Sequence, residues 1–184
     1  MRLASFYKLF PVPKYLELST VGIDISDQSI KFAELTYSPK GYRLGRYGDV
    51  NLPPGAIVSG KIVNREALID TLRQIKQKNN FGYIYASLPE EETFAVRMTI
   101  PWVKQSELGG SIELLLEEYI PLPVDQVVFD YEIYVKPKLE GENYILGVFV
   151  APRTLVADYT AVLQAAGFAV AGLEMEVQSS ARAL

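Results

Sequence analysis

Apolar and polar side chains alternate along the chain from residue 20 to about residue 50. This period of two predicts three strands, over residues 20–26, 30–37 and 42–50. A helical period follows over residues 65–78, with Asn64 in the N-cap position and an apolar face formed by Leu68, Thr71, Leu72 and Ile75. Residues 83–88 then predict a further strand. This part of the chain therefore predicts a three-stranded meander, a helix and one more strand.

The pattern changes at about residue 91, where a smaller unit is expected. It predicts, in order, a strand over 92–100, a helix over 104–119, strands over 128–136 and 143–150, and a helix over 153–166. The first of these helices is expected to bury a stripe formed by Leu108, Ile112, Leu115, Leu116 and Tyr119. Residues 168–173 predict a strand that returns to the first sheet, before a last helix over 176–184.

This order of elements predicts a mixed α/β chain in three parts. Residues 1–19 form a tail, and residues 20–90 plus 167–184 form a core. Residues 91–166 form an inserted β-α-β-β-α subdomain between the two segments of the core.

Composition narrows the chemistry that is open to the chain. It has 184 residues, 49% hydrophobic and 22% charged, which is typical of a globular protein with a buried core. A net charge of -4 argues against nucleic-acid binding, because such surfaces neutralise phosphates with clustered Lys and Arg. The sequence has no Cys and no His, which excludes thiolate and imidazole sites and leaves carboxylates with Mg²⁺ as the route to catalysis.

The opening segment is the part of the sequence with a possible membrane role. No stretch approaches the ~20 apolar residues of a transmembrane helix. Residues 1–19 combine Phe6, Leu9 and Phe10 with basic side chains, a mixture typical of peripheral contact with an anionic membrane surface. A tail that packs on the domain or stays disordered is the alternative.

The stretch from Val21 to Leu35 is the most informative for chemistry. It predicts two strands around a tight polar turn, with Asp24 placed to orient the water shell of a Mg²⁺ ion. The turn offers backbone N–H groups to phosphate oxygens, and Lys31 lies on the return strand within their reach. The candidate nucleotide and magnesium residues are Asp24, Ser26, Asp27, Gln28, Ser29 and Lys31. A plain β-hairpin without a ligand is the alternative.

These residues resemble the opening of the actin-like ATPases, and within them the PilM family of type IV pilus assembly. The family opens on Gly-hydrophobic-Asp-hydrophobic-Gly-Ser-x-Ser-hydrophobic-Lys, which Gly22, Asp24, Ser29, Ile30 and Lys31 fit. Two Pro-containing blocks, residues 50–62 and 118–131, are more similar to PilM than to FtsA. The resemblance spans residues 20–184, roughly the N-terminal half of a family member. It implies an α/β (α+β) fold, with an actin-like, ribonuclease-H-like ATPase subdomain and an inserted subdomain.

The turn departs from the family pattern at Ser26-Asp27, where the family has Gly-Ser. A carboxylate repels phosphates, so nucleotide binding is expected to be weakened, and Asp27→Ser is expected to strengthen Mg-ATP affinity. The resemblance implies ATP and Mg²⁺ as ligands of a longer parent, because the family's second phosphate loop and adenosine segment are expected beyond residue 184. At most weak ATP binding or hydrolysis is expected of that parent.

The resemblance implies an adaptor rather than an enzyme. Family members lie in the cytoplasm at the periphery of the inner membrane, act with other pilus assembly proteins, and bind the short cytoplasmic tail of PilN, a single-pass membrane protein. The tail is expected in a groove between core and insert, with Phe94, Ile120 and Leu122 as candidate groove residues; ordinary core packing is their alternative.

Other functions stay open at this point. The chain is also compatible with an FtsA-like division filament, or with a sugar-kinase-type phosphotransferase whose cleft lies near Glu90–Glu92. A type II secretion system or a DNA-uptake machine is as open as a pilus.

Overall fold

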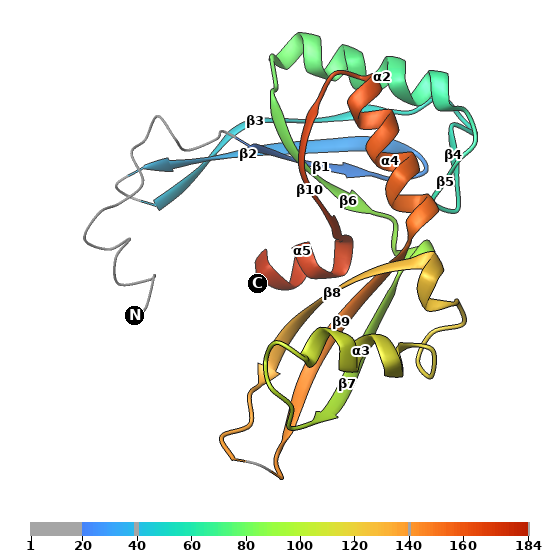
Figure 1. Ribbon diagram of the computed structural model, residues 1–184. Coiled ribbons are helices and arrows are strands. Elements are labelled where there is room, and N and C mark those ends of the chain that lie inside the picture. Colours follow the sequence, from blue (N-terminus) through green and yellow to red (C-terminus); the bar gives the residue numbers. More distant parts are fainter. Residues whose placement is uncertain (1–19, 39–40, 140, 184) are drawn as a thin grey trace.

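The computed structural model describes residues 20–38, 41–139 and 141–183, so the predicted tail at residues 1–19 lies outside the described part. A five-stranded sheet in the order β10-β6-β1-β2-β3 forms the larger layer (Figure 1). Its strands are β1 (Thr20–Ile25), β2 (Ser29–Ser38), β3 (Gly41–Asn51), β6 (Tyr83–Leu88) and β10 (Ala169–Met175). β1, β2 and β3 form the predicted antiparallel meander, and β6 runs parallel to both β1 and β10. The predicted return of the last strand to this sheet is confirmed.

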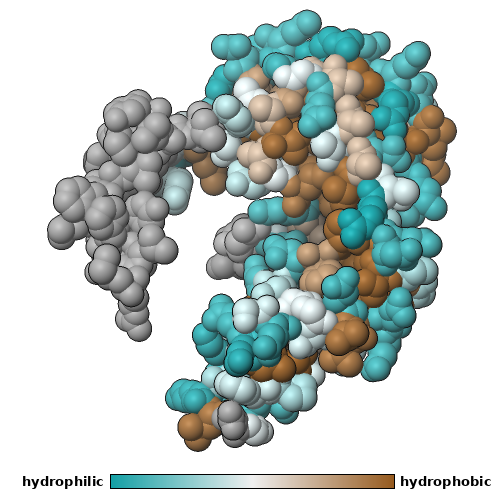
Figure 2. Space-filling model, in the orientation of Figure 1, coloured by the Kyte–Doolittle hydropathy of each residue, from teal (hydrophilic) through white to brown (hydrophobic). Residues whose placement is uncertain are grey.

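Strict alternation makes one face of this sheet apolar. In β1, for example, Val21, Ile23 and Ile25 are buried on the same side. Helices α2 (Arg65–Asn79) and α4 (Arg153–Ala165) cover this face and complete a single core with it. Figure 2 shows hydrophilic side chains along the outer side of α2, which is the pattern of a helix with one buried face.

The helix predicted over residues 65–78 is confirmed within one residue. Asn64 caps its start, because its side-chain oxygen accepts a hydrogen bond from the Ala67 amide at 3.1 Å. Asn80 ends it in the left-handed conformation, with φ of 50°. The buried face consists of the predicted residues Leu68, Thr71, Leu72 and Ile75.

A smaller antiparallel sheet, in the order β7-β9-β8, carries helix α3 (Leu108–Leu116) on one face. Its strands are β7 (Phe94–Pro101), β8 (Val127–Val135) and β9 (Asn143–Pro152). Together with α3 these strands bury a second apolar cluster, which includes Met98, Ile100, Leu108, Ile112, Leu116, Leu146 and Val148.

Helix α3 is shorter than the helix predicted over 104–119. Residues 104–107 form a turn, in which the Glu107 amide donates to the Lys104 carbonyl at 2.8 Å. Gly109 and Gly110 follow and weaken the first helical turn. Tyr119, predicted on the buried stripe, lies beyond the end of the helix and is 44% exposed.

Helix α4 packs with the larger sheet. The predicted insert, residues 91–166, ended with this helix. In the structure its buried residues Leu155, Tyr159, Val162 and Leu163 belong to the first cluster rather than to the second. The unit that gathers around the second cluster therefore runs from β7 to β9.

The pattern analysis missed a short hairpin. β4 (Ile57–Val58) and β5 (Lys61–Ile62) pair antiparallel around a two-residue turn. Ser59 and Gly60 in that turn have φ of 49° and 74°, the pair of positive angles that a type I′ turn requires. Further along, a 3₁₀ turn at Glu90–Glu92 delays β7, which was predicted from residue 92 and begins at Phe94.

Helix α5 (Glu176–Ala183) follows β10 and lies between the two sheets (Figure 1). Among the described residues, no helix combines the length and the apolar character needed to cross a membrane.

Candidate functional site

Asp24 and Lys31 lie opposite each other in the β1–β2 hairpin, as register partners. Both side chains project from the sheet face that α2 and α4 leave open, since directly opposite residues share a face. Ser87, near the end of the neighbouring strand β6, donates its hydroxyl hydrogen to Asp24 Oδ1 at 2.5 Å. These three residues line a cavity of about 540 Å³, and Glu176 and Ser179 of α5 form part of its wall.

The predicted phosphate turn is held together by its own serines. The amide and hydroxyl of Ser26 both donate to the Ser29 carbonyl at 3.0 Å, and Ser26 Oγ accepts from the Ser29 amide at 3.2 Å. The Gln28 carbonyl accepts from the Leu52 amide at 2.8 Å, which ties the turn to the end of β3. Within the described part of the chain, the amides of Asp27 and Gln28 have no hydrogen-bond partner. These two N–H groups are the donors that the turn offers to an anion.

The Asp27 carboxylate is bound to the β4–β5 turn. Its Oδ2 accepts from the Ser59 amide at 2.8 Å, and its Oδ1 accepts from the Gly60 amide at 3.1 Å. The charge that was expected to repel phosphates is therefore partly offset by two backbone donors. Neither Ser26 nor Asp27 has a positive φ, so this turn has no conformational need for the glycine of the family pattern.

The electrostatic field in this cavity is negative. Partial burial raises the pKa of the Glu176 carboxyl, the charges of Asp24 and Glu90 raise it further, and Lys31 opposes them. In the described ranges no three acidic side chains are grouped closely enough to hold a metal ion. The site therefore offers a cation one carboxylate, Asp24, in a field that favours positive charge.

Two of the three predicted groove residues lie together. Phe94 and Leu122 line a cavity of about 550 Å³, beside the start of β7, the loop before β8 and the start of α4. Ile120 does not join them, because it is 5% exposed and packs in the second cluster. It has the alternative role of ordinary core packing. Acidic side chains form much of the remaining wall: Glu91, Glu92 and Asp125.

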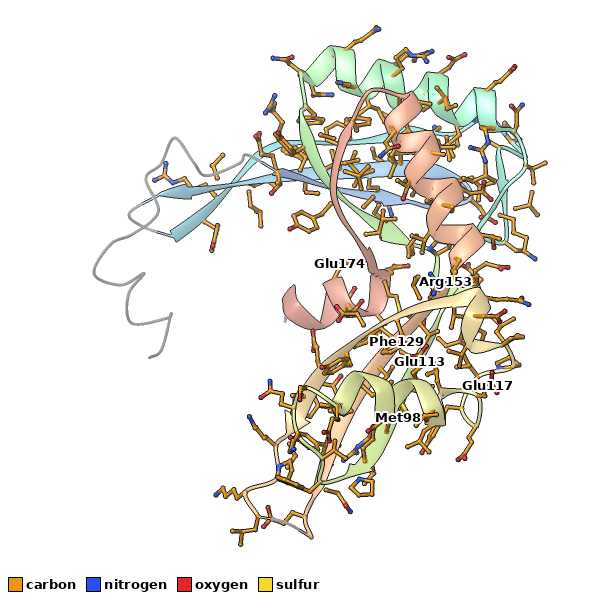
Figure 3. The ribbon with its side chains drawn as sticks, viewed as in Figure 1. Met98, Glu113, Glu117, Phe129, Arg153 and Glu174 are labelled. Atoms are coloured by element: carbon orange, nitrogen blue, oxygen red, sulfur yellow. The ribbon has the colours of Figure 1, made fainter. Side chains whose placement is uncertain are left out.

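The loop that carries Leu122 is anchored on both sides. Glu117 Oε1 accepts from the Val124 amide at 3.2 Å, and Arg153 Nε donates to the Asp125 carbonyl at 2.9 Å. Figure 3 shows Glu117 and Arg153 beside this loop. These contacts hold one wall of the groove in place before any ligand arrives, and such preorganisation lowers the entropic penalty of binding.

Sequence reasoning did not single out Ser87, Glu176 or Arg153. A signal existed for Ser87, which resembles Asp24 as a polar residue near the end of a buried strand and meets it through the parallel pairing of β1 and β6. No local pattern marks Glu176 or Arg153, because each reaches its site through tertiary packing. Glu90–Glu92 form a 3₁₀ turn, in which Glu92 pairs with Lys61 at 3.3 Å.

An antiparallel three-stranded meander continued by two parallel strands, with an acid-tipped hairpin facing a cavity, is the architecture of the actin-like fold. The family model for the type IV pilus assembly protein PilM matches residues 22–184, and the chain belongs to this family. The resemblance of the hairpin and the two Pro-containing blocks is thereby confirmed.

Two solved structures share this fold. The PilM-PilN type IV pilus biogenesis complex matches with a TM-score of 0.77 and 21% identity, over 86% of this chain and 48% of that one. The cytoplasmic domain of EpsL, an inner membrane component of the type II secretion system of Vibrio cholerae, matches with a TM-score of 0.58 and 18% identity, over 86% of this chain and 58% of that one. This chain thus spans about half the length of the structures it matches.

Proposed function

We propose that this chain is part of a cytoplasmic adaptor, peripheral at the inner membrane, that binds the tail of a PilN-like single-pass membrane protein in a type IV pilus or related secretion complex. The observation that carries the proposal is the groove of about 550 Å³ at Phe94 and Leu122. Membership of the PilM family and the fold shared with a PilM-PilN complex support this choice of partner.

The walls of the groove fit a particular kind of peptide. Phe94 and Leu122 are half-buried, so each presents apolar surface to an apolar anchor of the ligand. Glu91 and Asp125 are exposed on the same groove. Cytoplasmic segments next to a membrane span are rich in Lys and Arg, and such charges complement an acidic rim and speed association. The tail we expect is therefore short, with apolar anchors and flanking basic residues.

We also propose a nucleotide role for the β1–β2 hairpin in the longer parent protein. The free amides of Asp27 and Gln28 are placed to receive phosphate oxygens, and Lys31 adds a positive charge on the cavity side. Asp24, oriented by Ser87, fits a carboxylate that holds Mg²⁺ through its water shell. The hairpin supplies these groups from one side only, so we propose binding of Mg-ATP and no more than weak hydrolysis.

The groove is tested with a fluorescent peptide that carries the cytoplasmic tail of the PilN-like protein from the same genome. We expect saturable binding that weakens as salt rises, because rim charges are screened. Leu122→Ser should weaken binding about tenfold, corresponding to about 1.4 kcal/mol. The control is Leu114→Ser on α3, where Leu114 is 84% exposed and away from the groove. Absence of binding to the wild-type chain, or equal loss in both variants, contradicts the proposed function.

A further inference from the structure

The tip of the β4–β5 hairpin touches both candidate sites. On one side, the amides of Ser59 and Gly60 hold the Asp27 carboxylate, which belongs to the β1–β2 turn. The two donors are consecutive in a type I′ turn, so they approach the two carboxylate oxygens together. Any movement of the Asp27 side chain therefore changes both hydrogen bonds at once.

On the other side, the same tip contacts a segment that enters the smaller sheet. A Cβ atom on Gly60 would lie 2.7 Å from Pro89 Cβ, so the backbone packs directly on that ring. Lys61 pairs with Glu92 at 3.3 Å. Pro89 and Glu92 flank the 3₁₀ turn that leads from β6 to β7.

The tip also contacts the helix that leaves the smaller sheet. The hydroxyl of Tyr159, on α4, donates to the Gly60 carbonyl at 2.9 Å, and Tyr159 is 1% exposed. Burial raises the pKa of the Tyr159 hydroxyl, and the carboxylates of Asp27 and Glu91 raise it further. These electrostatic effects place the acids of the turn and of the groove around one buried hydroxyl.

The segments that the tip contacts are also walls of the groove. Glu91, Glu92 and Phe94 come from the entering segment, and Arg153 and Thr154 come from the start of α4. We propose that Asp27 and the Ser59–Gly60 tip couple the β1–β2 turn to the peptide groove, so that a ligand on the turn changes the affinity of the groove for its peptide. This inference rests on the proposed function for the identity of the two ligands, and the contacts that carry the coupling are independent of it.

The coupling has a stated direction. A phosphate at the amides of Asp27 and Gln28 brings negative charge next to the Asp27 carboxylate, and like charges repel. The carboxylate then shifts against the tip, and Pro89 and Tyr159 transmit the shift to the two walls. By reciprocity, a peptide in the groove changes the affinity of the turn for its anion by the same factor.

The first test needs no ligand and compares Asp27→Ala with wild type by NMR. We expect amide exchange at Ser59 and Gly60 to accelerate at least tenfold, with chemical-shift changes at residues 89–94 and 153–156. Asp27→Asn, which keeps one acceptor oxygen, should give the same pattern with smaller changes, and it serves if the alanine variant folds poorly. The control is Asp70→Ala, which removes an exposed carboxylate paired within α2. Faster exchange at the tip with unchanged signals at 89–94 and 153–156 overturns the coupling.

The second test measures the PilN-like tail peptide on the same variants. We expect Asp27→Ala and Tyr159→Phe each to change its affinity three- to tenfold, and Asp70→Ala to leave it unchanged. Equal affinities in all four proteins overturn the coupling. If the wild-type chain binds no peptide, the proposed function fails instead, and the ligand-free NMR comparison alone decides whether the tip couples the two segments.

Discussion

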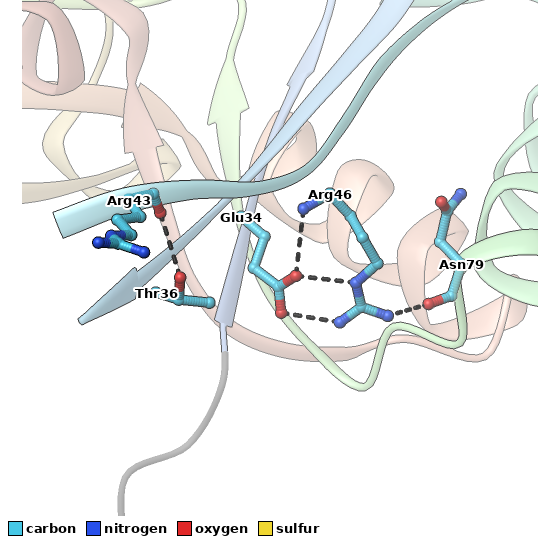
Figure 4. Close-up of polar contacts among 5 residues, drawn as sticks. All are labelled: Glu34, Thr36, Arg43, Arg46 and Asn79. Atoms are coloured by element: carbon cyan, nitrogen blue, oxygen red, sulfur yellow. Dashed lines mark hydrogen bonds and ion pairs between the residues drawn. The ribbon is translucent and has the colours of Figure 1, made fainter. Parts of the chain in front are cut away.

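Arg46 holds the carboxylate of Glu34 at two points within the β2–β3 ribbon (Figure 4). Its Nε donates to Oε2 at 2.8 Å, and its Nη2 donates to Oε1 at 2.7 Å. The Glu34 side chain is 7% exposed and that of Arg46 is 45% exposed. The same guanidinium also donates to the Asn79 carbonyl at the end of α2 and lies 4.7 Å from the ring centroid of Phe81. One arginine thus joins the ribbon to the helix layer.

Arg46→Met is expected to lower the free energy of unfolding by about 2 kcal/mol. The variant leaves a buried carboxylate without its guanidinium, which costs ~3–5 kcal/mol when both partners are fully buried and less here because Arg46 is half exposed. Urea denaturation measures the change. Arg43→Met is the matched control, because Arg43 lies exposed on the same strand and its loss should change stability by less than about 0.5 kcal/mol. Equal losses in the two variants would show that the buried pair has no special weight.

Gly48→Ala should destabilise the chain by about 1–3 kcal/mol through overpacking. An added Cβ would lie 2.6 Å from Cζ of Phe32. That ring has little room to move, because it is 8% exposed and packs edge-on against Phe81 at 5.3 Å. Gly110→Ala in α3 is the opposite case: its added Cβ meets nothing within 4 Å, and alanine should stabilise the helix by about 0.5–1 kcal/mol. Thermal unfolding of both variants checks the difference in sign.

The elements that the sequence predicted well are those with local signals. Helix α2 has a side-chain cap at Asn64, a complete apolar face and a left-handed residue at Asn80, so its ends are encoded within the helix itself. Helix α3 lacks a side-chain cap and has two glycines in its first turn, so the apolar stripe alone overestimated its length. The β4–β5 hairpin was missed because its strands have two residues each, although Ser59-Gly60 is a composition that fits a type I′ turn.

The candidate sites divide in the same way. The pairing of Asp24 with Lys31 followed from the hairpin register, which is a local property. The contact of Asp27 with Ser59 and Gly60 joins residues that are 32 and 33 positions apart, and no periodicity reports such a contact. Ile120 was chosen as a groove residue for its place between prolines, whereas its burial in the second cluster depends on how α3 packs on the smaller sheet.

Tyr159→Phe is expected to lower the free energy of unfolding by about 1–2 kcal/mol. The variant keeps the ring but removes the donor to the Gly60 carbonyl, and a buried acceptor without its partner carries a desolvation penalty. Tyr144→Phe is the control, because Tyr144 is also buried but its hydroxyl donates over a longer distance, 3.3 Å, to the Val103 carbonyl. Chemical denaturation should show the smaller loss for Tyr144→Phe, and the reverse order would contradict the importance of the bond to Gly60.

The pH dependence of stability should report the acidic field around Glu176. Partial burial and the charge of Asp24 raise the pKa of this carboxyl above its ordinary value of 4.5, so the folded state holds the proton more tightly than the unfolded state. The resulting stabilisation is fully present below the ordinary pKa and is lost as pH rises through the raised one. Between pH 4 and pH 7, wild type should therefore lose stability relative to Glu176→Gln.

The expected change is small, because most of the Glu176 side chain is in contact with water: less than about 2 °C in the relative unfolding midpoint. Glu113→Gln on the exposed side of α3 is the control, and its difference from wild type should be the same at both pH values. Adding the Asp24→Asn substitution removes one of the two repulsive charges nearest in effect, so it should reduce the pH-dependent difference. A midpoint difference that moves in the opposite direction as pH rises would mean that Lys31, and not the acids, dominates the field in this cavity.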